Sequence, residues 1–129
     1  EAAELACKII RPSYISLDTV LQKSGIVFQY DSAITVVSYL SRTLRVDERL
    51  IHYKKIKDAI LTNPQGLIQN ASYTEASPER AFLDALYLYG DVHFDRVTGL
   101  DRGLIEHLLQ NVYRQAALEK RVRKALRNA

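Results

Sequence analysis

The sequence predicts an α+β fold in which a small, mainly antiparallel sheet packs with N-terminal, central and C-terminal helices. At both ends of the chain, apolar residues recur at helical spacing and are flanked by capping signals, whereas the middle contains short runs rich in β-branched residues. The connections between these runs are too short for helical crossovers, which favours antiparallel pairing. A length of 129 residues fits one domain, so we expect residues 1–129 to form a single domain.

Two short helices are predicted at the N-terminus. Apolar spacing indicates the first over residues 3–10, and Pro12 ends it because the residue before a proline disfavours helical angles. The second is predicted over residues 17–24. Ser16 is then expected as its N-cap, and Gly25 as the left-handed residue after its last turn.

Four segments in the middle of the chain are predicted strands. They are rich in Val, Ile, Thr and Tyr or alternate in polarity, and turn signals such as Asp31-Ser32 separate them. The predicted strands are residues 26–28, 34–38, 50–56 and 67–73.

Helical signals return in the last third of the chain. Ser77-Pro78-Glu79 predicts the start of a central helix over residues 78–89, because serine caps, proline suits the first turn and an acid favours the helix dipole. A loop is expected over residues 91–99. From Leu104 onward apolar pairs recur every four residues, which predicts one long helix or two abutting helices that run into a basic tail.

The composition excludes several classes of protein. Hydrophobic residues make up 47% and charged residues 26%, which is typical of globular proteins and unlike disordered ones. The longest apolar runs are strand-sized, so we expect no membrane partner. The single cysteine, Cys7, excludes an internal disulfide and favours a reducing, cytoplasmic setting. Met is absent even from position 1, which favours a chain that lacks upstream residues.

Basic residues gather in the tail. Residues 113–129 hold six Lys or Arg residues against one Glu, a density that attracts polyanions or an acidic protein surface. A solvated helix face that only aids solubility is the alternative reading. A predicted strand and the residues after it add three lysines. The candidate nucleic-acid or partner-binding residues are Lys54, Lys55, Lys57, Arg114, Lys120, Arg121, Arg123, Lys124 and Arg127.

Catalytic chemistry finds little support in the sequence. A metal-dependent nuclease or other hydrolase that uses Asp84, Asp91 and Asp95 is one alternative function. Asp84 lies on the apolar face of the central helix, so we expect it to be partly buried and anchored by Arg80 or a backbone amide. The histidines lack metal-ligand spacing and the glycines form no phosphate loop. We therefore expect a non-enzyme with no catalytic residues, metal or cofactor.

Two motifs are more distinctive. They are Arg11-Pro12-Ser13-Tyr14-Ile15-Ser16-Leu17 and Ala76-Ser77-Pro78-Glu79-Arg80-Ala81-Phe82-Leu83-Asp84. Their order, with strands between them, resembles the AbiEi family, the antitoxins and transcriptional regulators of type IV toxin–antitoxin systems. The resemblance covers about residues 5–90. The chain departs from the family pattern at Val20, Arg80 and Phe82, where alanine, lysine and leucine are usual.

The resemblance implies that the chain is the C-terminal antitoxin domain of a bacterial regulator. The winged helix-turn-helix domain that normally precedes the first motif is then missing from this chain. As partners it implies a nucleotidyltransferase-type toxin, which the antitoxin counteracts, and operator DNA, through which the family represses its own transcription. The missing module would read the bases. A pure protein-docking domain remains a further alternative.

Overall fold

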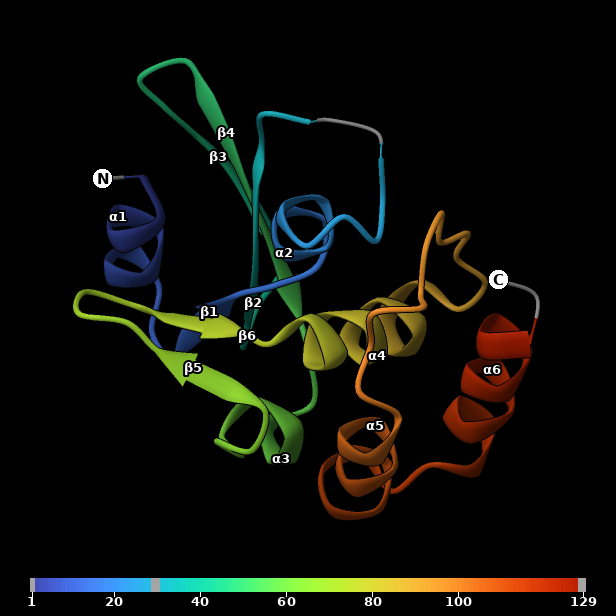
Figure 1. The fold of residues 1–129 in the computed structure, drawn as a ribbon. Coiled ribbons are helices and arrows are strands. Elements are labelled where there is room, and N and C mark those ends of the chain that lie inside the picture. Colours follow the sequence, from blue (N-terminus) through green and yellow to red (C-terminus); the bar gives the residue numbers. More distant parts are fainter. Residues whose placement is uncertain (1, 29–30, 128–129) are drawn as a thin grey trace.

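The computed structural model describes residues 2–28 and 31–127 and contains a six-stranded mixed sheet with helices on both faces (Figure 1). The predicted α+β class is confirmed. The strand order is β3-β4-β2-β1-β6-β5. The strands are β1 (Ser13–Ile15), β2 (Ile34–Ser38), β3 (Arg42–Val46), β4 (Arg49–Lys55), β5 (Leu67–Gln69) and β6 (Thr74–Ala76). The helices are α1 (Ala2–Ile9), α2 (Asp18–Lys23), α3 (Asp58–Leu61), α4 (Pro78–Tyr89), α5 (Arg102–Leu108), the π-helical η1 (Leu109–Tyr113) and α6 (Ala116–Arg127).

Strand pairing in the sheet is more mixed than short connections alone indicate. The pairs β1–β2, β3–β4 and β5–β6 are antiparallel, whereas β2–β4 and β1–β6 are parallel. The β2–β4 pair needs no helical crossover, because β3 follows β2 in the chain while β4 inserts between them in the sheet. A short connection therefore fixes the relative direction of the two strands that it joins, but it does not fix the direction of the other strands beside them.

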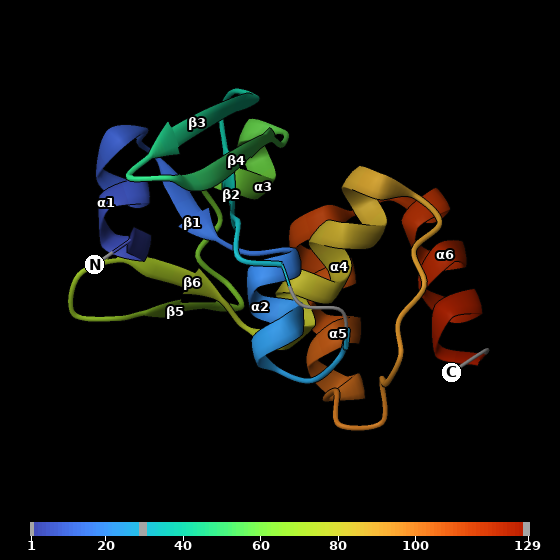
Figure 2. The ribbon, with the colours of Figure 1, turned by 90° about the horizontal axis from the view of Figure 1, so that it is seen from above.

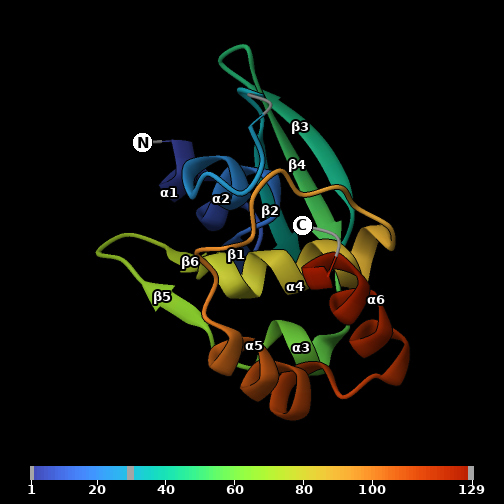
Figure 3. The ribbon, with the colours of Figure 1, turned by 45° about the vertical axis from the view of Figure 1, so that its right-hand side comes forward.

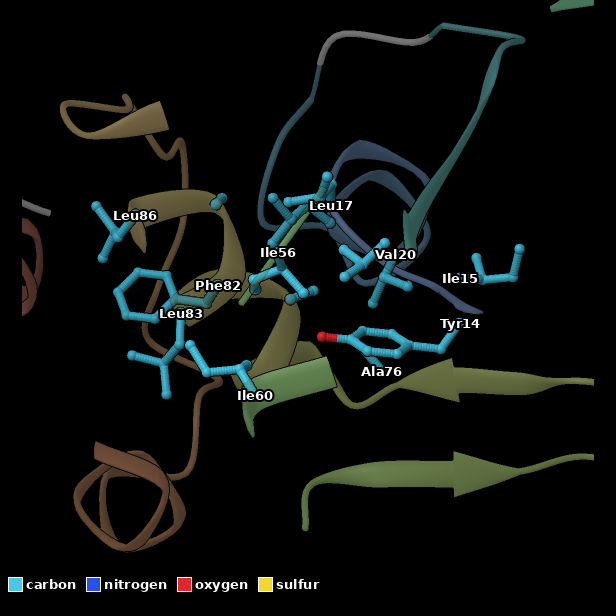
Figure 4. Close-up of a cluster of buried hydrophobic side chains, with 14 of the residues drawn as sticks. Tyr14, Ile15, Leu17, Val20, Ile56, Ile60, Ala76, Phe82, Leu83 and Leu86 are labelled. Atoms are coloured by element: carbon cyan, nitrogen blue, oxygen red, sulfur yellow. The ribbon is translucent and has the colours of Figure 1, made fainter. Parts of the chain in front are cut away.

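Different helices cover the two faces of the sheet (Figure 2). Tyr53 of β4 faces α1 and donates a hydrogen bond from its hydroxyl to the Ala6 carbonyl at 2.6 Å. Because side chains alternate along a strand, the register places Tyr14 of β1 on the opposite face. In Figure 4 the Tyr14 ring lies near Val20 and Ala76, and its hydroxyl points toward α4.

The central helix α4 is where the core is densest. Every residue from Glu79 to Leu86 is buried, because the sheet, α2, α5 and α6 surround this helix (Figure 3). Its predicted start is confirmed, since the Ser77 hydroxyl accepts a hydrogen bond from the Arg80 amide at 3.2 Å. The buried apolar side chains form one continuous cluster around α4.

The second helix ends as predicted but begins differently. Gly25 has a φ of 74°, and the Ile26 amide donates to the Leu21 carbonyl at 2.9 Å, which is the hydrogen bonding of a Schellman motif. The expected N-cap role of Ser16 is wrong. The helix begins at Asp18 without a side-chain cap, because the Ser16 hydroxyl donates to Asp84 instead.

Two predicted strands differ in the structure. Residues 26–28 form no strand, because the Ile26 carbonyl accepts hydrogen bonds from the amides of Asp95 and Arg96 in a distant loop. The segment 67–73 is not one strand but β5 and the turn that leads into β6.

The sequence argument also missed β3, which forms a hairpin with β4. Asp47 and Glu48 both have positive φ values, 50° and 67°, and close the hairpin in the conformation of a type I′ turn. At the C-terminus, of the two predicted alternatives the structure has separate helices and not one long helix. The helical segment of α5 and η1 ends at Tyr113, and Arg114, with a φ of 51°, breaks the helix before α6.

No helix among residues 2–28 and 31–127 is both long and apolar enough to cross a membrane.

Candidate nucleic-acid interface and buried motif cluster

The two sequence motifs meet in one buried polar cluster. The hydroxyls of Tyr14 and Ser16, from the first motif, donate to Asp84 Oδ2 at 2.9 and 2.8 Å. The Tyr113 hydroxyl of η1 donates to Asp84 Oδ1 at 2.5 Å. Asp84 is fully buried and anchored by hydrogen bonds, but its donors are hydroxyl groups where Arg80 or a backbone amide was expected.

Arg80, one turn before Asp84 in α4, completes the cluster. Its Nη2 donates to the Tyr14 hydroxyl at 3.3 Å, so Tyr14 bridges Arg80 and Asp84. The guanidinium also packs over the Tyr14 ring, with its central carbon 4.9 Å from the ring centroid. Three further hydrogen bonds, 2.5–2.6 Å long, reach the carbonyls of Ile60, Asn63 and Gln65.

The cluster therefore ties four parts of the chain together. From α4, Arg80 donates hydrogen bonds to carbonyls in α3 and in the turn that follows α3. Asp84 accepts hydrogen bonds from β1 and the residue just beyond β1, and from η1. A buried charge whose partner is lost is costly, so the motif residues depend on one another. We interpret the two motifs as a signature of this fold.

Burial raises the pKa of Asp84 above its ordinary value, although the Arg80 charge and the three hydroxyl donors oppose the shift. Burial and the nearby Asp84 charge also raise the pKa of Tyr14 and of Tyr113 well above their ordinary values. Both tyrosines consequently keep their protons near neutral pH and serve as hydrogen-bond donors to the carboxylate.

The raised pKa of Asp84 predicts a specific pH dependence of stability. An acid whose pKa is higher in the folded than in the unfolded chain binds more protons when folded, so the free energy of unfolding falls as pH rises through the folded pKa. We expect the wild type to gain stability relative to Asp84→Asn as pH falls from about 7 to about 4, because only the wild type has this titrating group. Urea denaturation of both proteins measures the difference. A difference that stays constant with pH, or grows in the opposite direction, would contradict the prediction.

The three candidate lysines around the end of β4 do not share one face. Lys54 and Lys55 are consecutive in the strand, so their side chains point to opposite faces of the sheet. Lys54 is half-buried on the face of Asp18. Burial raises the pKa of Asp18, and the Lys54 charge opposes that shift. Lys55 and Lys57 are exposed at the end of the strand.

Half of the basic residues in the tail are already engaged within the chain. Arg121 donates to the Leu86 carbonyl at 3.1 Å, and Arg123 forms a bidentate ion pair with Glu106. The hydrogen bond from Arg123 lowers the pKa of Glu106. Lys124 lies 3.8 Å from a carboxylate oxygen of Asp91. Within residues 2–28 and 31–127, the exposed side chains of Arg114, Lys120 and Arg127 form no ion pair.

The basic candidates therefore do not form one surface. The β3–β4 hairpin and α6 lie on opposite sides of α4 (Figures 1 and 2). Sequence reasoning missed two exposed arginines on β3, Arg42 and Arg45. The alternating pattern of residues 42–46 could have indicated this strand and its charges.

The acidic residues of the hydrolase alternative are held apart in different environments. Asp84 is sealed in the motif cluster, and Asp91 lies near Lys124. Asp95 accepts a hydrogen bond from the Phe28 amide at 2.7 Å and lies 3.2 Å from His93. Across the part of the chain that the structure describes, no group of three or more His, Cys, Asp or Glu side chains has a geometry that could hold a metal ion. That geometry gives the alternative no shared metal site.

Comparison with known proteins adds no assignment. A scan against protein-family models, a search of curated proteins and a search of solved structures each found no match.

Proposed function

We propose that the chain is the antitoxin module of a bacterial type IV toxin–antitoxin system. It acts in the cytoplasm by binding rather than by catalysis, counteracts a nucleotidyltransferase-type toxin, and contributes to repression of its own operon through contacts with DNA. The observation that carries the proposal is the meeting of the two motifs in one cluster, where Tyr14 and Ser16 contact Asp84.

This cluster supports the resemblance because it gives the motif residues a joint physical role. The first motif supplies hydroxyl donors, and the second supplies a buried acid and a buried base about one helical turn apart. Neither motif could satisfy its buried polar groups alone. The motif pair is thus one structural requirement, which makes its occurrence by chance in an unrelated fold less plausible.

The proposed DNA contacts involve phosphate groups and not bases. Arg114, Lys120 and Arg127 are exposed and are not held in ion pairs by described residues, so they are available to phosphates. Such contacts release counterions and carry no sequence information. Sequence-specific reading is therefore assigned to a module outside these residues.

The antitoxin role is tested by growth of a bacterial host. We expect the chain to restore growth when it is expressed together with the nucleotidyltransferase-type toxin encoded beside its gene. Arg80→Met, which removes a central group of the cluster, serves as the control for a damaged fold. Absence of rescue by a folded wild-type chain would contradict the proposal. Gel filtration of the mixed proteins then tells whether the two make direct contact.

The DNA role is tested by the salt dependence of binding to duplex DNA. Replacement of Lys120 and Arg127 by alanine is expected to reduce the slope of log K against log salt by roughly 2, because each phosphate contact contributes about 0.9. Arg123→Ala is the matched control, because Glu106 already occupies that guanidinium. An unchanged slope in the double variant would remove α6 from the DNA interface.

A further inference from the structure

An exposed aromatic ring stands at the turn between β2 and β3. Tyr39 is 50% exposed, yet the turn that carries it is well held. The buried Ser38 donates from its hydroxyl to the Leu40 carbonyl at 2.5 Å and accepts from the Leu40 amide at 3.2 Å. The ring is thus presented to solvent by a fixed backbone.

The end of β4 forms hydrogen bonds with the residues just before and just after Tyr39 and Leu40 in this turn. The Ile56 amide donates to the Ser38 carbonyl at 3.0 Å, and the Lys55 amide donates to the Ser41 hydroxyl at 2.9 Å. β2 and β4 are parallel neighbours that end side by side, with Ser38 opposite Lys55 (Figure 3). Neighbouring strands are about 4.8 Å apart, so Tyr39 lies within one or two strand spacings of the residues that end β4.

Three exposed cations lie on the strand ends and segments that adjoin this turn. Arg42, Lys55 and Lys57 are all exposed, and in the described part of the chain none of the three takes part in an ion pair. Between residues 32 and 58 the only acids are those of the distant Asp47-Glu48 hairpin turn and Asp58 at the start of α3. The adjoining segments 38–42 and 55–58 therefore carry three cations against one acid, a net charge of +2.

We propose that this edge binds single-stranded nucleic acid, with Tyr39 as a stacking platform for a base and Arg42, Lys55 and Lys57 as phosphate contacts. An aromatic face flanked by cations is how proteins hold single strands without sequence preference. A duplex keeps its bases stacked internally and could use only the cations.

A protein partner fits the same edge less well. Protein interfaces have an apolar core, and the other large exposed hydrophobic side chains of the described chain lie on different elements, at Leu5, Ile9, Phe28, Ile68 and Tyr89. The exposed side chains on the segments next to Tyr39 are instead polar or cationic, namely Ser41, Arg42, Lys55 and Lys57. The inference goes beyond the proposed function, because it requires neither a toxin nor an operator.

Fluorescence anisotropy of residues 1–129 with labelled oligo-dT and oligo-rU of about 12 nucleotides, a length within the usual site size, tests the proposal. We expect Tyr39→Ala to weaken binding of at least one single strand by about 5- to 150-fold, the effect of losing one stacked base. Tyr39→Phe keeps the ring and should bind within about twofold of the wild type. Tyr89→Ala, at the other exposed tyrosine among the described residues, should leave binding unchanged.

Inorganic polyphosphate separates stacking from charge, because it has the phosphates but no bases. Lys55→Ala should weaken binding of both polyphosphate and the oligonucleotides, whereas Tyr39→Ala should weaken only the latter. The proposal is overturned if the wild type binds neither single strand at low salt. Equal affinity of Tyr39→Ala and the wild type, or equal losses in the phenylalanine and alanine variants, would also overturn it.

Discussion

Replacement of Arg80 by methionine is expected to lower the free energy of unfolding by about 3–5 kcal/mol, the usual cost of breaking a buried charged cluster by removing one member. Methionine keeps most of the apolar stem but none of the hydrogen bonds. Three backbone carbonyls around α3 would lose their donor, and Asp84 would stay buried without a nearby positive charge. Urea denaturation followed by circular dichroism measures the change.

Two control variants separate the loss of the Arg80 charge and hydrogen bonds from a general effect of replacing an arginine by methionine. Arg80→Lys keeps the positive charge but cannot reach every acceptor, so an intermediate loss is expected. Arg102→Met changes an exposed arginine and should alter stability by no more than about 0.5 kcal/mol. If Arg80→Met were as stable as Arg102→Met, the cluster would not hold the fold together.

Replacement of Asp84 by alanine is expected to cost a similar amount, about 3–5 kcal/mol, for the complementary reason. The hydroxyls of Tyr14, Ser16 and Tyr113 would all lose their acceptor, and Arg80 would lose the charge that compensates it. Asp84→Asn keeps the shape and one acceptor oxygen, so it should be less damaging than alanine. The same denaturation experiment ranks the two variants.

A double-mutant cycle then tests whether the bridge through Tyr14 couples the two charges. Because removing both leaves neither charge unpaired, Arg80→Met with Asp84→Ala should cost less than the sum of the single changes, by about 1–3 kcal/mol. Strict additivity would mean that Arg80 and Asp84 act independently, contrary to the bridged geometry.

Local signals in the sequence predicted the elements whose hydrogen bonds are made nearby. The Ser77 cap and the Gly25 helix end both depend on hydrogen bonds within a few positions. The strand at 34–38 was predicted from its own β-branched residues, although its strand partners are distant. The segment 26–28 failed for the opposite reason. Its β-branched residues suit a strand, but a loop almost 70 residues away supplies the partner of the Ile26 carbonyl and of the Phe28 amide.

The candidate site divides in the same way. The sequence identified which residues carry positive charge, but Arg121 and Arg123 are held by Leu86 and Glu106, partners 35 and 17 positions away. The sequence likewise indicated that Asp84 would be buried. The three hydroxyl partners of Asp84 could not be predicted, because two of them are about 70 positions away and the third lies on another helix.

Local patterns in the sequence were enough to predict the fold class, the central helix with its serine cap, and the burial of an acid on its apolar face. These features follow from short-range periodicity and from hydrogen bonds within one or two turns. Three other features emerge only when the chain is folded: the Ser16 hydroxyl donates to Asp84, β4 inserts beside β2, and Tyr39 is exposed to solvent. The physical reason is that a buried polar group bonds to whichever partner the packing brings near, and that partner can lie anywhere in the chain.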